Sequence, residues 1–385
     1  MKIGFVSIED AACLTPNSIH SYYEAKALRD QGLEVRFLGP LALKRTPAIF
    51  VRRLISRLFQ GNRFLPYRDP VLVQDLARQV MEKLDQTPVD LIFSYGTIPI
   101  SLLDCHIPVV FWSDATFAGM IGFYSGYTHL NQASLRSGNL LEQSALDRAA
   151  MAFYSSEWAR RTCLENYRVD PAKVKVVPFG ANLAYEPSLA DVESNIRARA
   201  MQPCRLVFVG TEWERKGGDL ALGLAALLHR SGLLPELIVI GSKPTAKIGL
   251  PDYVRVIRYI DTSSSTGQDT YREQLARSHF LVLPTWADCS PRVLYEAGSL
   301  GLPCLATDVG GISSIIHPGV NGGLFPTGQE FVKQAAAFVM EAMHTSVGYR
   351  ELAVRTVVYH QENHTWDRAT SIIKTLLAGI LPVDV

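Results

Sequence analysis

The sequence has no run of about 18 apolar residues, so it predicts no membrane-spanning helix. It has no excess of charge either, because 38 Lys and Arg nearly balance 37 Asp and Glu, which disfavours nucleic acid as the main partner. The six cysteines form no CxxC pair, a usage typical of reduced thiols that favours a cytoplasmic location. The nine histidines form no HxH pair, and no metal site is predicted. No GxGxxG turn follows the first strand, which disfavours a dehydrogenase.

The chain is long enough for two domains. Its 385 residues, 48% of them hydrophobic, exceed the size at which one core usually stops growing. Two runs of apolar strands alternate with helices, a pattern typical of parallel sheets covered on both faces. The predicted strands cover 2–7, 34–38, 91–95, 108–112, 152–155 and 174–177 in the first run, and 205–209, 236–240, 254–257, 280–283 and 304–306 in the second. The polar segment 182–203 predicts the boundary, giving domains 1–190 and 200–365 and a helical tail, 366–385.

A turn after the strand 205–209 combines cations with glycines. Arg215 and Lys216 stand directly before Gly217-Gly218, and a helix is predicted to follow. The glycines allow the backbone to approach a ligand closely, and the two cations neutralise negative charge. The turn therefore predicts a diphosphate site, with a solvated charged turn as the alternative.

A second polar turn follows the strand 280–283. It reads Asp288-Cys289-Ser290-Pro291 and leads into a helix that carries Glu296. Backbone amides of Ser290, Arg292 and Val293 at a helix N-terminus suit an anion, and the two carboxylates can accept hydrogen bonds from hydroxyls. This combination predicts a phosphorylated ligand that carries a polyol. The alternatives are a turn aspartate that bonds nearby amides and a glutamate that complements the helix dipole.

The spacing of these residues resembles a known donor-site pattern. Asp288, Glu296, Gly301-Leu302-Pro303 and Gly310-Gly311 occur in the order found in family 4 glycosyltransferases, which make retaining transfers from nucleotide sugars. Lys216-Gly217 matches the second part of the GR…KG pattern of that family. Two positions depart from it: Thr211 stands where arginine is usual, and Asp288, where glutamate is usual, sets its carboxylate back by about one C–C bond. The resemblance implies the GT-B fold, with two Rossmann-like, doubly wound domains facing across a cleft and a C-terminal helix that crosses back.

The resemblance also implies roles for individual residues. Glu296 would bind the nucleotide ribose, Asp288 the transferred sugar, and Arg215 and Lys216 the departing diphosphate without a metal ion. Asp114 would lie near the acceptor hydroxyl, with a structural turn aspartate as the alternative. The predicted catalytic residues are Asp114, Arg215, Lys216 and Asp288. The predicted donor-binding residues are Asn17, Arg215, Lys216, Arg258, Tyr259, Ile260, Asp288, Ser290, Pro291, Arg292, Val293 and Glu296.

The implied activity is transfer of a hexose-like sugar from a UDP or GDP sugar to a hydroxyl. The acceptor would be a glycan, a lipid-linked glycan or a small molecule, in the assembly of polysaccharide, lipopolysaccharide or glycolipid. No cofactor besides the donor is expected. Two alternatives stay open: a nucleotide-sugar epimerase on the same fold, and a silent sugar-nucleotide-binding subunit that scaffolds a partner enzyme. The departures at Thr211 and Asp288 keep the silent subunit open.

The segment 44–68 is basic and amphipathic. It contains seven cations and no acidic residue, with apolar residues at helical spacing. Such a helix can bind an anionic membrane, which would make the protein peripheral on the inner face of the cell membrane. The alternative is an ordinary domain helix with a solvated basic face. The cations are Lys44, Arg45, Arg52, Arg53, Arg57, Arg63 and Arg68, and the apolar residues are Ile49, Phe50, Leu54, Ile55, Leu58 and Phe59.

Overall fold

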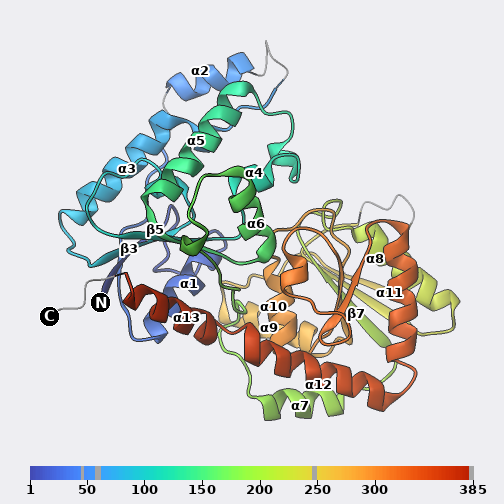
Figure 1. Cartoon of the computed structure of the whole chain (residues 1–385). Coiled ribbons are helices and arrows are strands. Elements are labelled where there is room, and N and C mark those ends of the chain that lie inside the picture. The colour runs from blue at the N-terminus through green and yellow to red at the C-terminus, as the bar shows by residue number, and fades with distance from the viewer. Residues whose placement is uncertain (45–46, 57–61, 245–248, 381–385) are drawn as a thin grey trace. The chain divides into compact units, whose positions relative to one another are not determined.

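A computed structural model describes residues 1–44, 47–56, 62–244 and 249–380 (Figure 1). Its contacts separate into two units, one formed by Met1–Val177 with Ala369–Val385 and the other by Pro178–Arg368. Each unit is built on one six-stranded sheet in which every strand pair is parallel. The predicted alternation of strands and helices in two successive halves is therefore confirmed.

The first unit contains a sheet with the strand order β2-β1-β3-β4-β5-β6. Its strands are β1 (Lys2–Val6), β2 (Glu34–Phe37), β3 (Leu91–Tyr95), β4 (Val109–Ser113), β5 (Ala149–Tyr154) and β6 (Val174–Val176). The helices between these strands are α1 (Ile19–Asp30), α2 (Pro47–Ile55), α3 (Pro70–Leu84), α4 (Phe117–Met120), α5 (Gln132–Arg148) and α6 (Glu157–Asn166). Short 3₁₀ turns are η2 (Pro66–Arg68), η3 (Ile98–Ile100), η4 (Ser125–Tyr127) and η5 (Pro171–Lys173).

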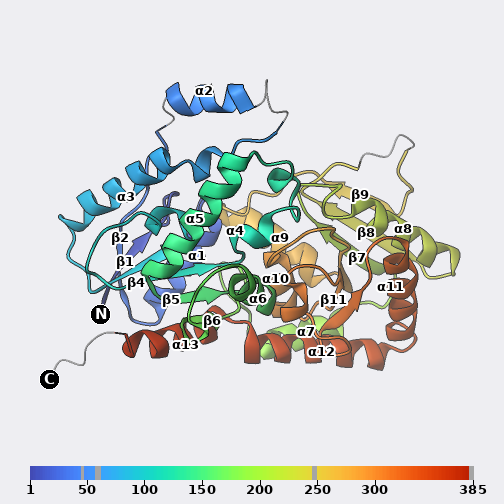
Figure 2. The same cartoon turned by 45° about the horizontal axis from the view of Figure 1, so that its top comes forward.

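Both faces of the first sheet are apolar. On one face, Phe93 of β3 stacks on Phe5 of the neighbouring β1 and on Phe153 of β5, beyond β4, with ring centroids 5.9 and 6.4 Å apart. On the opposite face, Ile92 and Phe111 belong to a core that includes buried residues of α3, α5 and α6. Figures 1 and 2 show α3 and α5 lying together over one face of this sheet. Burial on both faces explains why these strands are continuous apolar runs in the sequence.

The second unit contains a sheet with the order β12-β11-β10-β7-β8-β9. Its strands are β7 (Cys204–Val209), β8 (Pro235–Ile240), β9 (Val254–Ile257), β10 (Phe280–Leu283), β11 (Cys304–Thr307) and β12 (Gly322–Phe325). Its helices are α7 (Leu189–Ala198), α8 (Gly218–Arg230), α9 (Ser265–Ala276), α10 (Arg292–Ser299), α11 (Gln329–Ala342) and α12 (Ser346–Asn363), with the 3₁₀ turn η6 (Ile312–Ser314).

The two faces of the second sheet differ in the side chains that β7 and β8 place on them. Leu206, Phe208 and Leu237 point into a core shared with α8, α11 and α12. Because side chains alternate along a strand, Arg205 and Glu236 lie on the other face, where they form an ion pair of 2.9 Å. One face of this sheet is therefore apolar, whereas the other carries charges at the start of its strands.

The boundary between the units differs from the predicted one. The segment 182–203 lies within the second unit and contains α7, whose Val192 and Ile196 are buried in that unit's core. The polar composition of α7 hid two apolar positions one helical turn apart, which is enough to dock a short helix. The helical tail is α13 (Trp366–Ala378), and its residues from Ala369 belong to the first unit, where Lys374 Nζ donates to Gln31 O at 2.8 Å.

Among the described residues, no helix is both long enough and apolar enough to span a membrane.

Candidate functional site

Two loops meet at the carboxyl edge of the second sheet. β7 and β10 are neighbouring parallel strands, so the loops that follow them leave the same edge. The first loop, 210–217, leads into α8, and the second, 284–291, leads into α10. The carbonyl oxygen of Arg215 accepts hydrogen bonds from Trp286 N at 2.8 Å and from Thr285 Oγ1 at 3.0 Å. These bonds fasten the two predicted ligand loops to each other.

The side chains of the two loops form a charge cluster. The Lys216 ammonium contacts Asp288 Oδ2, and Arg215 Nη1 lies 3.6 Å from the same oxygen. Arg215 Nη1 also donates to Ala287 O at 2.7 Å, and its Nη2 donates to Glu212 Oε1 at 2.6 Å. Asp288 is only 7% exposed, so solvent screens its pairing with the cations less than it would at the surface. Asp288 is thus brought beside Arg215 and Lys216, although 72 residues separate it from Lys216 in the sequence.

Glycine is required where the loops approach most closely. Gly217 has a φ of +76°, and a Cβ added there would lie 2.0 Å from the carbonyl oxygen of Pro284. A Cβ on Gly218 would lie 2.2 Å from the ring of Trp213. The paired glycines of the first loop therefore let its backbone lie against the second loop, which positions Lys216 beside Asp288.

Glu296 lies on α10 and is buried against α9. Its carboxylate accepts a hydrogen bond of 2.6 Å from the Tyr271 hydroxyl, and the residue is only 8% exposed. Burial raises the pKa of Glu296 to about 7, against the opposing effects of the Tyr271 hydrogen bond and the Arg292 charge. Burial and the neighbouring Glu296 also raise the pKa of Tyr271, so this hydroxyl stays a donor at neutral pH.

The raised pKa of Glu296 predicts a pH-dependent stability. Between its usual value of 4.5 and about 7, the folded chain holds a proton that the unfolded chain releases. The free energy of unfolding therefore falls as pH rises through this window, by up to about 3 kcal/mol from this group. In Glu296→Gln, which cannot ionise, this contribution disappears. Urea unfolding of wild type and variant at pH 4.5 and pH 7.5 measures the difference.

Comparison with the variant is needed because buried histidines act in the opposite direction. Burial lowers the pKa of His279 to about 4 and that of His364 to about 3, which adds stability as pH rises. Both histidines are retained in Glu296→Gln, so their effect cancels in the difference. If the difference in unfolding free energy between the two proteins does not change with pH, the raised pKa of Glu296 is contradicted.

The remaining residues of the second loop differ in what their side chains contact. Ser290 Oγ lies 3.2 Å from Tyr295 Oη, and α10 begins at Arg292, directly after Pro291. The Arg292 guanidinium lies over the Phe179 ring, 3.2 Å from its centroid. The prediction for Arg292 and Val293 concerns their backbone amides, which lie in the first turn of α10.

The other predicted donor residues lie in separate loops. Arg258, Tyr259 and Ile260 follow β9 at the same carboxyl edge of the second sheet, and Arg258 and Tyr259 are exposed. Asn17 and Asp114 belong to the first unit, where they follow β1 and β4 and are exposed. The roles of these five residues stay predictions.

Sequence reasoning missed two residues of this site. Tyr271 supplies the hydrogen bond to Glu296, and Thr285 anchors the second loop to Arg215. A tyrosine on an amphipathic helix is indistinguishable from a core residue in the sequence, so no signal marked Tyr271. Within the described ranges, no three or more His, Cys, Asp or Glu side chains are grouped as metal ligands.

Comparison with known protein structures identifies the fold as GT-B. Sucrose-phosphate synthase from Thermosynechococcus elongatus matches with a TM-score of 0.72 at 15% identity, covering 99% of both chains. HepE of Anabaena, solved in complex with UDP-glucose, matches with a TM-score of 0.64 at 16% identity, covering 98% of this chain and all of its own. WaaG, a glycosyltransferase involved in lipopolysaccharide biosynthesis, gives 0.63 at 15% identity over 97% and 99% of the chains.

Sequence comparison identifies the family. A model described as Glycosyltransferase Family 4 matches residues 18–185, and one described as Glycosyl transferases group 1 matches residues 203–341. The chain belongs to the family 4 glycosyltransferases, as its donor-site pattern indicated.

Curated relatives carry one recurring name. D-inositol 3-phosphate glycosyltransferase of Actinosynnema mirum is 30% identical over 227 residues, which are 55% of this chain and 52% of that protein. The corresponding protein of Rhodococcus erythropolis is 30% identical over 218 residues, 53% of this chain and 48% of its own. The chain therefore spans about half the length of the curated relatives it matches.

Proposed function

We propose that this protein is a retaining glycosyltransferase that moves a hexose-like sugar from a nucleoside diphosphate to a hydroxyl group. The observation that carries the proposal is the cluster of Arg215, Lys216 and Asp288 between two fastened loops. The two cations face two carboxylates, Asp288 and Glu212, but the Glu212 side chain is 58% exposed, so solvent screens its charge, and the helix N-termini beside the cluster add partial positive charge. This site suits a diphosphate that gains charge as it departs.

Each residue of the cluster has a role in the proposed reaction. The bond between the sugar C1 and the diphosphate oxygen breaks, and a new bond forms between C1 and the acceptor oxygen. Lys216 and Arg215 stabilise the charge that accumulates on the diphosphate, in place of a metal ion. Asp288 holds Lys216 before the donor binds and accepts hydrogen bonds from the sugar hydroxyls afterwards. The acceptor loses its proton to the departing phosphate or to Asp114, the proposed polar group at the acceptor.

Recognition of the nucleotide is assigned to the second unit. The Glu296 carboxylate, buried and already accepting a hydrogen bond from Tyr271, would accept hydrogen bonds from the ribose hydroxyls. The backbone of 258–260 would contact the base, and the amides of Ser290, Arg292 and Val293 the distal phosphate. Asn17, in the first unit, would donate to the donor phosphate.

The related proteins suggest which donor to test first. HepE was solved with UDP-glucose, so UDP-hexoses come before GDP-hexoses. The names of the relatives suggest two acceptor classes, namely inositol phosphate and the glycans of lipopolysaccharide. Assembly of a polysaccharide, lipopolysaccharide or glycolipid is the proposed setting.

The test measures release of nucleoside diphosphate. Purified protein is incubated with UDP- and GDP-hexoses and with acceptor extracts, with and without EDTA. Transfer that persists in EDTA and retains the anomeric configuration, read by NMR of the product, is the expected result. Donor binding without release of diphosphate across all acceptors would instead favour the silent subunit. Conversion of the donor to its epimer without an acceptor would favour the epimerase.

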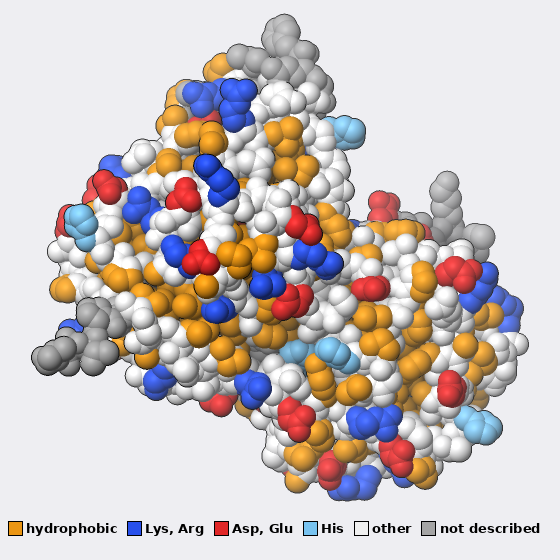
Figure 3. Space-filling model, viewed as in Figure 1, with side chains coloured by type: hydrophobic (Ala, Val, Ile, Leu, Met, Phe, Trp, Pro, Cys, Tyr) orange, Lys and Arg blue, Asp and Glu red, His pale blue; other side chains and the backbone are white. Residues whose placement is uncertain are grey.

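We also propose that the first unit contacts an anionic membrane through α2. Figure 3 shows basic and hydrophobic side chains gathered over α2. Phe50 is 68% and Leu54 46% exposed, with Val51 also exposed, whereas Ile49 is buried. Exposed apolar side chains beside cations fit a lipid surface.

The cations of this segment are less available than the sequence implied. Arg52 pairs with Asp69 at 2.6 Å, Lys44 lies 3.8 Å from Asp75, and Arg68 forms a buried pair with Glu142 at 2.9 Å. The partners come from outside the segment, which is why its composition concealed them. Arg45, Arg57, Leu58 and Phe59 lie outside the described residues. The exposed apolar residues therefore carry the membrane proposal.

Flotation with anionic phospholipid vesicles tests this proposal. Replacing Phe50 and Leu54 together by Ser should lower the membrane-bound fraction at least about tenfold, because each side chain would otherwise bury apolar surface in lipid. The matched control replaces the exposed Leu234 and Val347 of the second unit by Ser. Equal flotation of both variants would end the proposal for α2.

A further inference from the structure

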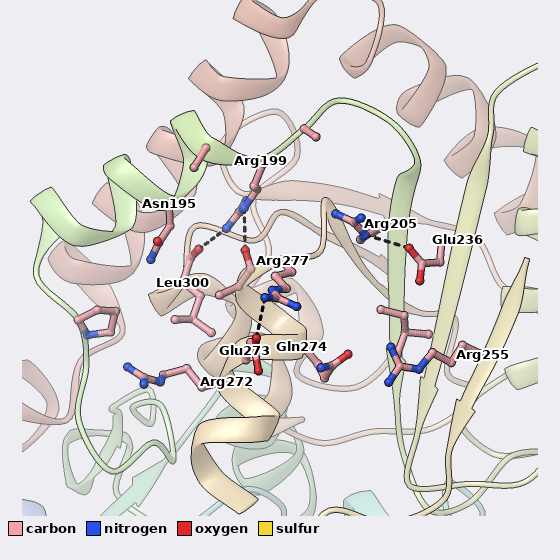
Figure 4. A pocket seen from close by; sticks show the side chains of 15 residues that line it. Asn195, Arg199, Arg205, Glu236, Arg255, Arg272, Glu273, Gln274, Arg277 and Leu300 are labelled. Carbon is pink, nitrogen blue, oxygen red and sulfur yellow. Dashed lines mark hydrogen bonds and ion pairs between the residues drawn. The ribbon is translucent and has the colours of Figure 1, made fainter. Parts of the chain in front are cut away.

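A pocket of about 620 Å³ lies at the opposite edge of the second sheet from the candidate donor site. It is bounded by α7, by α9 and by the first residues of β7, β8 and β9 (Figure 4). The donor-site loops follow the carboxyl ends of β7, β9 and β10, whereas this pocket opens at the amino ends. Parallel strands place these two edges on opposite sides of the unit, so the pocket is a different site.

The pocket is lined by arginines. Five arginines and two glutamates contribute to its wall, and none of its cations is a lysine. The planar guanidinium group matches the oxygens of a phosphate in pairs, which an ammonium group cannot do. The formal excess of three positive charges, one of which Asp269 offsets by pairing with Arg272 at 3.1 Å, calls for a multiply charged anion.

Arg199 has a structural role, because its guanidinium group bonds to backbone carbonyl groups. It is 5% exposed and donates to Ala276 O at 2.9 Å, Leu300 O at 2.7 Å and Gly301 O at 2.9 Å. These carbonyl groups lie at the C-terminal ends of α9 and α10, where a cation complements the helix dipole. Arg199 therefore fixes the wall of the pocket.

Two further arginines pair with carboxylates that are themselves accessible. Arg205 pairs with Glu236 at 2.9 Å, and their side chains are 30% and 29% exposed. Arg277 pairs with Glu273 at 2.8 Å across one turn of α9, with both side chains largely exposed. Solvent-exposed pairs of this kind contribute little stability, so an incoming anion can recruit either guanidinium at small cost.

Unlike Arg205, Arg272 and Arg277, Arg255 pairs with no carboxylate among the described residues. It is exposed, and it has no hydrogen-bond or ion-pair partner among residues 1–44, 47–56, 62–244 and 249–380. Figure 4 shows its side chain extending from β9 into the pocket, toward α9. Its direct neighbour in the sheet is the uncharged Ile238, and Glu236, two residues earlier on β8, pairs with Arg205.

We propose that this pocket binds a small phosphorylated molecule, a phosphate monoester or diphosphate, at a site distinct from the sugar-nucleotide site. Arg255 would contact the phosphate first, and Arg205 on β7 and Arg277 after α9 would add further hydrogen bonds to its oxygens. A volume of about 620 Å³ fits a ligand of this size, since small-molecule pockets span roughly 300–1,000 Å³. The concave shape favours a small soluble ligand over an extended polyanion.

The test uses calorimetric titration with inorganic pyrophosphate at low ionic strength. Pyrophosphate could also enter the donor site, so all measurements are made in protein that carries Lys216→Met. Saturable binding with one site is expected. Adding Arg255→Glu should weaken binding at least tenfold, because it replaces a charged hydrogen-bond donor by a carboxylate that repels the anion.

The matched control is Arg230→Glu in the same background. Arg230 is exposed at the end of α8, outside the pocket, so the net charge changes equally while the pocket stays intact. Its affinity for pyrophosphate should change less than twofold. Arg277→Glu provides a second pocket variant, should Arg255→Glu fold poorly, with the same expected loss. The proposal is overturned if the Lys216→Met protein shows no saturable binding, or if pocket and control variants bind alike.

Discussion

Replacing Lys216 by Met is expected to lower the kcat of sugar transfer by about 10²–10³-fold. The methionine side chain keeps the aliphatic part of Lys216, whose Cγ lies 2.8 Å from where a Cβ on Gly210 would be. It removes the one ammonium group that the structure holds on Asp288 beside the proposed diphosphate. Because charge accumulates on the leaving group in the transition state, kcat should fall more than the affinity for the donor.

The control for this prediction is Lys333→Met. Lys333 is exposed on α11 and pairs only with the adjacent Glu330 among the described residues, so the same change of charge occurs far along the chain from the loops. Its kcat should stay within about twofold of wild type. Steady-state kinetics with the best donor and acceptor from the assay above decide the matter. A Lys216→Met enzyme with kcat near that of wild type would remove Lys216 from the mechanism.

Replacing Gly217 by Ala is expected to destabilise the second unit by about 3 kcal/mol or more. Part of this cost, about 1–2 kcal/mol, arises because an L-residue is forced into the left-handed region at a φ of +76°. The rest arises because the new Cβ would lie 2.0 Å from the backbone oxygen of Pro284, so one of the two loops must move. The movement should also weaken binding of nucleoside diphosphates, because Lys216 precedes this glycine.

Gly232→Ala separates the two causes. Gly232 has a φ of +85°, but a Cβ added there meets no atom within 4 Å. Its substitution should cost only the conformational part, about 1–2 kcal/mol, and leave ligand binding unchanged. Thermal and urea unfolding of both variants, with and without nucleoside diphosphate, give the comparison. If Gly217→Ala were no more destabilising than Gly232→Ala, the proposed clash between the new Cβ and the Pro284 oxygen would be contradicted.

Much of the fold could be predicted because buried parallel strands are continuous apolar runs. The strands β3, β9 and β10 begin and end at the predicted residues, and most others differ by one or two positions. β12 was missed because it begins with Gly322-Gly323, a pair typical of turns. A Cβ on Gly322 would lie 1.9 Å from Cys304 O, so contact with β11 demands the glycine that conceals the strand. α7 was missed for a related reason, since tertiary packing selects a helix with only two fully buried apolar positions.

The sequence predicted which loops carry the site residues, but not which of these residues pair with each other. The sequence placed Lys216 and Asp288 in loops at the ends of two strands, yet it could not show that these strands are neighbours. That adjacency follows from the order of strands in the sheet, which depends on contacts between residues far apart in the chain. The raised pKa of Glu296 and its bond to Tyr271 depend on burial between α9 and α10, which composition does not encode.

The sequence by itself determined the two parallel-sheet units, the family, and the loops that carry the donor pattern, because each depends on local runs, turns and spacing. Only the tertiary structure decided that one carboxylate is shared by two cations, that acidic residues outside 44–68 pair with Lys44, Arg52 and Arg68, and that five arginines line one pocket. The physical reason is that charge pairing and burial act through space. They join residues that strand order and helix packing bring together, whatever their separation along the chain.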